Sequence, residues 1–338
     1  MTVAHLSDLH LGYDGGTGGR GRAEDVLRAF EAAINRIAGL GPELVVIAGD
    51  VFDHPNVTAP PIAAFSRAVR RLRKRVPGVL VAVTAGARDT PLDPSHQGPL
   101  AVIGALQSVE AASTAVRRIP LAGGKVAVTL VPHLAARRGR ALKVGPDSAA
   151  KRNVLVLHGA VAHGRSAGES AGRRAPAPDA ATDPVRSAAR GWAATVPLGG
   201  WDYVALGSRH TRAKVAARAH YSGSLERIGP DPWEEATVDK GFLTARLDTG
   251  AVRFWPVEAR AAVSLAPVDA ADGGTATAAR RLSEALAGVP GGIDGKLLRI
   301  PVRGLCPEDL AALDRELLAR VRRRVAELRV DSLPATPR

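Results

Sequence analysis

Short runs of apolar residues recur along the first three quarters of the chain, and most of them are unbroken rather than alternating with polar residues. They lie at residues 3–6, 44–48, 79–84, 126–131, 154–157, 203–206, 242–247 and 252–255. Unbroken runs of this length are typical of strands that are covered on both faces. Helical patterns separate several of them, most clearly over 23–38 and 61–75. The alternation of the two patterns predicts a layered α/β domain.

The remainder of the chain has a different character. Residues 164–197 are rich in Arg, Ala, Pro, Ser and Gly and show no periodicity, which predicts a long exposed loop;. Beyond Pro256 an Ala- and Gly-rich stretch precedes one strand-like run at 296–302 and a helical pattern over 307–328. We therefore expect a main domain at residues 1–260 and a small α+β domain at residues 261–338.

Charge and cysteine content narrow the class of protein. The 46 Lys and Arg residues outnumber the 33 acidic ones, so the net charge is +13, and most of the cations are arginine. Guanidinium groups bind phosphate oxygens well, so a polyanionic partner is one interpretation; a solvated, compositionally biased surface is the other. Cys306, the single cysteine, excludes an intrachain disulfide and a cysteine-based metal cluster;. With no leader-like or membrane-spanning segment, a cytoplasmic location is expected.

Polar residues with metal-binding chemistry follow four of the predicted strands. Asp8 and His10 follow the first, Asp50 the second, and His158 and His210 two later ones. Open α/β sheets bind their ligands at the carboxyl ends of their strands, so these side chains are expected to converge. Carboxylate and imidazole ligands together suit manganese or iron. The combination predicts a metal-dependent hydrolase.

Two of these segments resemble a known family. Residues 5–12, His-Leu-Ser-Asp-Leu-His-Leu-Gly, and residues 49–53, Gly-Asp-Val-Phe-Asp, resemble the first two motifs of calcineurin-like metallophosphoesterases, and within them the SbcD-type DNA-repair nucleases;. Segments 201–207, 221–227 and 240–242 extend the resemblance over residues 1–260. It implies a four-layer α-β-β-α sandwich, and the tail resembles a short version of the capping domain that contacts DNA in those nucleases.

The resemblance also implies a ligand set, from which this sequence departs. One ion would be held by Asp8, His10, Asp50 and His210, all of which are present. The other would use the positions of Asp50, Ala87, His158 and Ser208. An alanine offers no lone pair and a neutral serine hydroxyl is a poor ligand. We therefore expect one Mn²⁺ ion, or Fe²⁺ or Mg²⁺, to bind well, and a second to bind weakly or not at all.

The third family motif, at residues 86–89, also differs from the pattern of the family. Arg88 occupies the position of the histidine that, by resemblance, orients the scissile phosphate and stabilises or protonates the leaving group. An arginine keeps its charge, so it can clamp a phosphate but cannot transfer a proton near neutral pH. Asp89 is the other catalytic candidate in this motif. Loss of such groups predicts little nuclease activity.

Further candidates surround these motifs. Asp53, His54 and His133 are expected to contact the substrate or support the ligands. Four cations share one face of the 61–75 helix and would either follow a phosphate backbone or form a solvated face: Arg67, Arg70, Arg71 and Lys74;.

The sequence leaves three functions open. The first is an SbcD-like subunit of a DNA-processing or repair complex that binds DNA, with attenuated or absent two-metal nuclease activity. The second is an active manganese-dependent DNA nuclease with one strong metal site. The third is a small-nucleotide phosphodiesterase or phosphatase, which the 221–227 motif, the tail and the charge disfavour. By resemblance, the partners are DNA, an SbcC-like coiled-coil ATPase and a second copy of the chain; the apolar face of the 310–328 helix would dock the ATPase or pack on its own domain.

Overall fold

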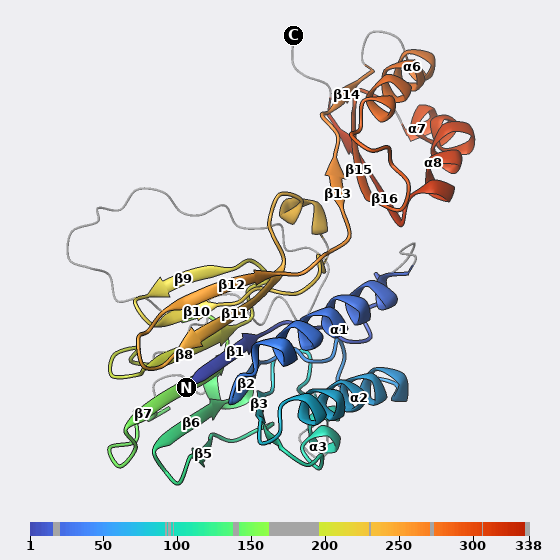
Figure 1. Ribbon diagram of the computed structural model, residues 1–338. Coiled ribbons are helices and arrows are strands. Elements are labelled where there is room, and N and C mark those ends of the chain that lie inside the picture. Colours follow the sequence, from blue (N-terminus) through green and yellow to red (C-terminus); the bar gives the residue numbers. More distant parts are fainter. Residues whose placement is uncertain are drawn as a thin grey trace, which may run out of the picture.

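The computed structural model describes residues 1–15, 21–91, 93, 96, 98–137, 142–161, 196–229, 231–270, 274–305 and 307–334. Two six-stranded sheets stack face to face, and a small third sheet lies toward the C-terminus (Figure 1). The loop predicted at 164–197 lies outside the described residues except for its last two positions. Among the described helices, none is long and apolar enough to cross a membrane.

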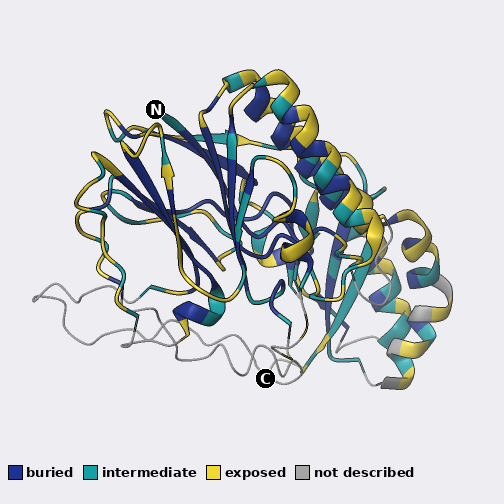
Figure 2. Ribbon diagram, turned by 90° about the horizontal axis from the view of Figure 1, so that it is seen from below, coloured by how far each residue is buried: buried dark blue, intermediate teal, exposed yellow. Residues whose placement is uncertain are grey.

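The first sheet has the order β12-β11-β1-β2-β3-β4. Its parallel strands are β1 (Thr2–Leu6), β2 (Leu44–Ala48), β3 (Leu80–Thr84) and β4 (Val109–Ala112). Antiparallel strands extend it: β11 (Gly241–Arg246) and β12 (Val252–Pro256). Its outer face is covered by α1 (Arg22–Leu40), α2 (Ala59–Arg75) and α3 (Pro99–Ile103). The two longer helices agree with the patterns at 23–38 and 61–75, and Figure 2 shows buried strands beneath helices exposed on their outer sides.

The second sheet has the order β5-β6-β7-β8-β10-β9. Its strands are β5 (Arg117–Leu121), β6 (Val126–Val131), β7 (Arg152–His158), β8 (Tyr203–Gly207), β9 (Ala213–Ala216) and β10 (Ala219–Tyr221). Side chains from both sheets form one core between them, including Val3, Val46, Val128 and Val156. Among the described residues, one short helix, α4 (His133–Ala136), packs on the outer face of this second sheet. The two sheets and the helical layer on the first agree with the expected sandwich.

The third sheet has its own core. Strands β13 (Ala262–Ser264), β14 (Val268–Asp269) and β16 (Glu327–Leu333) all pair in parallel with β15 (Leu297–Arg303). Helices α6 (Gly274–Ala287), α7 (Pro307–Leu313), η3 (Asp314–Leu318) and α8 (Ala319–Arg324) accompany it. The core beneath them is separate from those of the first two sheets. A division into domains 1–260 and 261–338 remains our proposal.

The prediction of a helix over 307–328 is wrong at its C-terminal end, where it extends too far. The helical segments end at Arg324, and Glu327–Leu333 forms β16, because seven of its residues pair in register with β15. The apolar face expected on this helix packs against the third sheet. Leu313, Leu318 and Val321 are buried in the core of that sheet, and Leu317 is half-buried against it. The side chain of Leu310 lies outside the described residues.

A buried ion network joins α1 to the C-terminal part of the chain. Arg22 and Asp25 both have fully buried side chains and pair at 2.8 Å. The Arg22 guanidinium also donates to the carbonyl of Arg227, while Arg260 bonds to Asp25 and to the carbonyl of Gly295. Charges removed from water in this way are stable only while every partner is present.

Replacing Arg22 with methionine should therefore lower the free energy of unfolding by about 3 kcal/mol, because Asp25 loses a fully buried partner;. Urea titration of the two proteins measures the change. Arg28→Met is the matched control, since Arg28 contacts the same carboxylate with a side chain that is 69% exposed. Exposed pairs contribute about 0–1 kcal/mol, so equal losses in the two variants would contradict a role for burial.

Candidate metal centre

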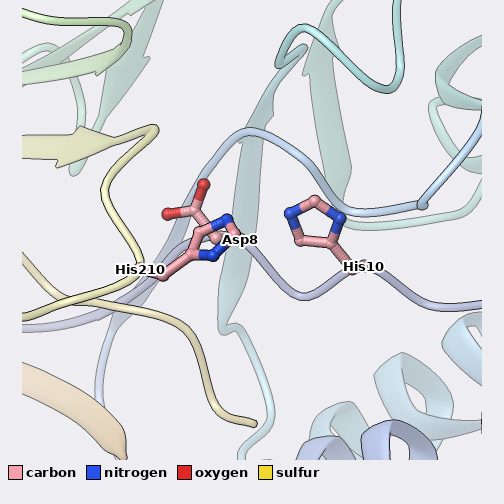
Figure 3. Close-up of side chains that lie close together, drawn as sticks. All are labelled: Asp8, His10 and His210. Atoms are coloured by element: carbon pink, nitrogen blue, oxygen red, sulfur yellow. The ribbon is translucent and has the colours of Figure 1, made fainter. Parts of the chain in front are cut away.

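The candidate metal ligands lie on loops at one edge of the stacked sheets. Asp8 follows β1, Asp50 follows β2, His158 ends β7 and His210 follows β8. Backbone hydrogen bonds join the first two loops, because the amide of Asp8 donates to the carbonyl of Gly49 (3.0 Å) and the amide of His10 to that of Asp50 (2.9 Å). Figure 3 shows Asp8, His10 and His210 close together, drawn from segments 200 residues apart in the sequence. The convergence expected at the strand ends is present.

These loops carry unusual backbone conformations. Six described non-glycine residues have positive φ, and four of them lie here: Asp8 (52°), His10 (48°), Asp50 (49°) and Ser208 (95°). The left-handed region costs a residue with a side chain about 1–2 kcal/mol, so it persists only where surrounding contacts impose it. Such strain clusters at functional sites, and here it turns the ligand side chains toward one another.

Two groups of ligand atoms overlap at Asp8. One comprises Asp8, His10 and His210, the other Asp8, Asp50 and His158, and within each group the ligand atoms lie within 4.8 Å of one another. The Asp50 Oδ2 atom lies 3.4 Å from His158 Nε2, in its own group, and 3.7 Å from His10 Nε2, in the other, so this carboxylate contacts ligands of both groups. Four of the five residues are at most 6% exposed.

Each histidine has its Nδ1 atom occupied. His10 Nδ1 donates to Asp53 Oδ1 (2.7 Å), and the Nδ1 atoms of His158 and His210 donate to backbone carbonyls at 2.8 and 3.3 Å. A proton on Nδ1 leaves Nε2 as the nitrogen that can bind an ion. The Nε2 atom of His10 is buried and has no hydrogen-bond partner in the described part of the chain. Aspartate and imidazole ligands with this orientation fit a divalent cation of the manganese or iron class.

Electrostatics within the cluster agree with this arrangement. Burial and the neighbouring His10 lower the pKa of His210 to about 3, so its imidazole is neutral. Burial also disfavours charge on His158, but the adjacent Asp50 carboxylate outweighs it and raises the pKa of His158 to about 10. Against the opposing effect of burial, His158 and His10 hold the pKa of Asp50 well below its usual range. An ion bound between these groups would replace the proton on His158.

Next to Ala87 and at Ser208, backbone amides contact the carboxylates. The amide of Arg88 donates to Asp50 Oδ1 (2.8 Å), and the amide of Ser208 donates to both oxygens of Asp8 (3.0 and 3.2 Å). Gly86 approaches so closely that a Cβ atom on it would lie 2.0 Å from Asp50 Oδ1. Ala87 is half-buried beside this contact and adds only a methyl group, while the hydroxyl side chain of Ser208 is exposed.

Asp89 holds two loops together. Its carboxylate, 2% exposed, accepts hydrogen bonds from the amides of Val51 (3.1 Å), Phe52 (2.8 Å) and Gly86 (3.0 Å). Both oxygens are thus engaged with the loops that carry Asp50 and Ala87. In this geometry Asp89 braces the backbone around the ligands, and its catalytic role stays a prediction.

The other sequence candidates lie at varying distances from the cluster. His54 is exposed and its Nδ1 accepts from the amide of Asn56 (3.0 Å), whereas His133, on α4, is half-buried with its ring 6.2 Å from that of His158. Arg67, Arg70, Arg71 and Lys74 are exposed on the outer face of α2, and Arg71 pairs with Glu31 at 3.0 Å. Because α2 begins near the site edge and crosses back to the start of β3, these cations occupy the half of the helix remote from the metal ligands.

Two residues without a predicted role contact the ligands. Ser7 donates from Oγ to Asp8 Oδ2 (2.6 Å), and Lys240 donates from Nζ to the carbonyl of His210 (3.0 Å). Both belong to motifs that resemble the family pattern. Nothing in the linear spacing shows which ligand each of them contacts.

Comparison with known proteins agrees with this geometry. Residues 1–124 match the family model of the calcineurin-like phosphoesterases. Residues 1–124 are therefore similar to a calcineurin-like metallophosphoesterase domain. The superfamily predicted from the 5–12 and 49–53 motifs is thereby confirmed over this part of the chain.

The chain also has distant relatives among DNA-repair proteins. The DNA double-strand break repair protein Mre11 of Methanopyrus kandleri is 31% identical over 104 residues, which cover 30% of this chain and 22% of that protein. The Mre11 protein of Aeropyrum pernix is 34% identical over 90 residues, covering 26% of this chain and 21% of that protein. The aligned segments thus span about a fifth of the length of these relatives.

Proposed function

We propose that this chain is an SbcD-like metallophosphoesterase subunit of a DNA-processing complex, which binds DNA and one divalent cation and has attenuated or absent two-metal nuclease activity. The observation that carries the proposal is the contrast between the two ligand groups. Asp8, His10 and His210 converge, whereas in the second group Ser208 contacts Asp8 through its backbone amide and Ala87, beside the Arg88 amide that donates to Asp50, carries a methyl side chain.

The retained group has a defined chemistry. Asp8, His10 and His210, with Asp50 beside them, would hold Mn²⁺, or Fe²⁺ or Mg²⁺, which supplies a Lewis acid and lowers the pKa of a bound water;. Asp53 holds the His10 ring in the tautomer that binds metal;. Arg88 contributes a permanent positive charge for a phosphate but no transferable proton, so departure of the leaving group would be slow.

Charge and similarity support a nucleic-acid substrate. The net charge of +13 favours a polyanion, and the relatives named above are DNA double-strand break repair proteins;. An SbcC-like ATPase and a second copy of this chain are the protein partners that the same relationship favours.

An active manganese-dependent nuclease is the second candidate, and the complete Asp8–His10–His210 group favours it. A cleavage assay with Mn²⁺ on linear and hairpin DNA, run beside fluorescence anisotropy on the same labelled DNA, separates the two. We expect binding without appreciable cleavage. Cleavage that Asp50→Asn abolishes would support the active nuclease, and absence of DNA binding would contradict a role in DNA processing.

The cations on α2 give the DNA proposal a mutational test. Replacing Arg67, Arg70, Arg71 and Lys74 with glutamine should weaken DNA binding and reduce the salt slope of log Kd by about one for each phosphate that the variant no longer neutralises. Anisotropy titrations from low to moderate salt measure both quantities.

A charge-matched control removes four exposed cations at the edge of the second sheet: Arg117, Arg118, Lys125 and Lys151. If the two quadruple variants bind DNA with the same reduced affinity, only the net charge matters and α2 is not a contact surface.

A further inference from the structure

We propose that Lys240 is a positioning residue for the metal ligand His210: its buried ammonium group holds the backbone of the His210 loop in place. The inference rests on the proposed metal binding and assigns to this lysine a role in keeping the ligand group assembled.

Lys240 has an unusual environment for a lysine. Its side chain is 1% exposed, although it immediately precedes β11. The Nζ atom donates to the carbonyl of His210 (3.0 Å) and to Ser224 Oγ (2.9 Å), and it pairs with the carboxylate of Glu235. Each of the three ammonium protons therefore has a buried or half-buried acceptor. Burial of an ammonium group is costly unless it is fully paired in this way, so the contacts hold three segments at one point.

His210 depends on such support more than the other ligands do. Its Nδ1 contact with a backbone carbonyl is 3.3 Å, the longest of the three histidine tethers, and the residue lies in the loop between β8 and β9. The His210 carbonyl accepts both from Lys240 and from the amide of Ser224 (3.0 Å). Gly223 packs against this carbonyl, since a Cβ atom there would lie 2.9 Å from its oxygen. The orientation of the imidazole is thus set largely through its own backbone.

The partner of Lys240 is anchored to the third sheet. Glu235 ends the short helix η2 (Pro232–Glu235), in which Trp233 packs against Leu297 and Ala326. The Arg227 guanidinium donates to the carbonyl of Glu235 (2.9 Å). Lys240 therefore connects the metal ligand His210 to the segment on which the C-terminal sheet rests.

The test is Mn²⁺ binding by isothermal titration calorimetry on the full chain, with thermal unfolding of the metal-free protein as the second readout. Lys240→Met keeps the length of the side chain and removes its charge, and we expect Mn²⁺ affinity to fall about tenfold or more. The double variant Lys240→Met, Glu235→Gln also removes the unpaired carboxylate. It should regain thermal stability without regaining Mn²⁺ affinity.

Ile37→Ala is the stability control, because Ile37 is fully buried near the C-terminal end of α1, which leads into the start of β2, whereas the ligands follow the ends of the strands. It should lower the melting temperature and leave Mn²⁺ affinity unchanged. If the double variant binds Mn²⁺ as tightly as the natural sequence, Lys240 is merely structural and the inference is wrong. If the natural sequence binds no Mn²⁺, the proposed metal site itself fails, and the inference fails with it.

Discussion

Replacing Asp50 with asparagine is expected to reduce Mn²⁺ affinity by at least about 100-fold, because the substitution removes the charge that contacts ligands of both groups. Asp50 Oδ2 lies 3.4 Å from His158 Nε2 and 3.7 Å from His10 Nε2. Asparagine has the same shape and keeps an oxygen for the amide of Arg88, so the loop contact at 2.8 Å is preserved. The loss should therefore arise from the ligand and not from a collapsed loop.

Isothermal titration calorimetry with Mn²⁺ measures this effect directly. Asp248→Asn is the control, since Asp248 is exposed and lies outside both ligand groups. Its affinity should match that of the natural sequence. If the Mn²⁺ affinity of Asp50→Asn stays within about threefold of that of the natural sequence, the ion is held elsewhere. Such a change in affinity corresponds to well under 1.4 kcal/mol of binding free energy.

The triple substitution Ala87→Asn, Arg88→His, Ser208→His is expected to raise the rate of Mn²⁺-dependent DNA cleavage by about 10²–10³-fold. A single group that stabilises a transition state contributes a factor of about this size. The backbone is already in place for it. The amides of Arg88 and Ser208 contact Asp50 and Asp8, so side chains placed at 87 and 208 start beside the second group. Ser208 has a φ of 95°, a conformation that histidine tolerates better than most residues;.

Two measurements check the restored site. Cleavage of linear and hairpin DNA reports activity, and calorimetry reports whether the number of bound Mn²⁺ ions rises from one to two. Adding Asp50→Asn to the triple variant should remove the gain. Cleavage by the natural sequence at the rate of an active triple variant would mean that one metal, or another set of ligands, is sufficient for catalysis, whereas inactivity of both would contradict the expected gain.

The location of the site could be predicted from sequence because its signals are local. Apolar runs end shortly before Asp8 and Asp50 and at His158, and within each sheet the parallel strands deliver their carboxyl ends to the same edge;. Helices α1 and α2 are predictable for the same reason, since their apolar spacing lies within one segment;. The error at Glu327–Leu333 has the opposite origin. That segment is a strand because β15 is available to pair with it, and β15 lies about thirty residues earlier.

The sequence by itself determined the chemistry available to this protein: which loops carry carboxylates and imidazoles, and that alanine, arginine and serine stand at positions 87, 88 and 208. Only the tertiary structure decided how those groups are held. The tether of His10 to Asp53, the brace formed by Asp89 and the contact of Lys240 with His210 join segments from 30 to 43 residues apart. Their energy depends on distances and burial that arise only when the sheets have stacked, and no local pattern in the chain encodes them.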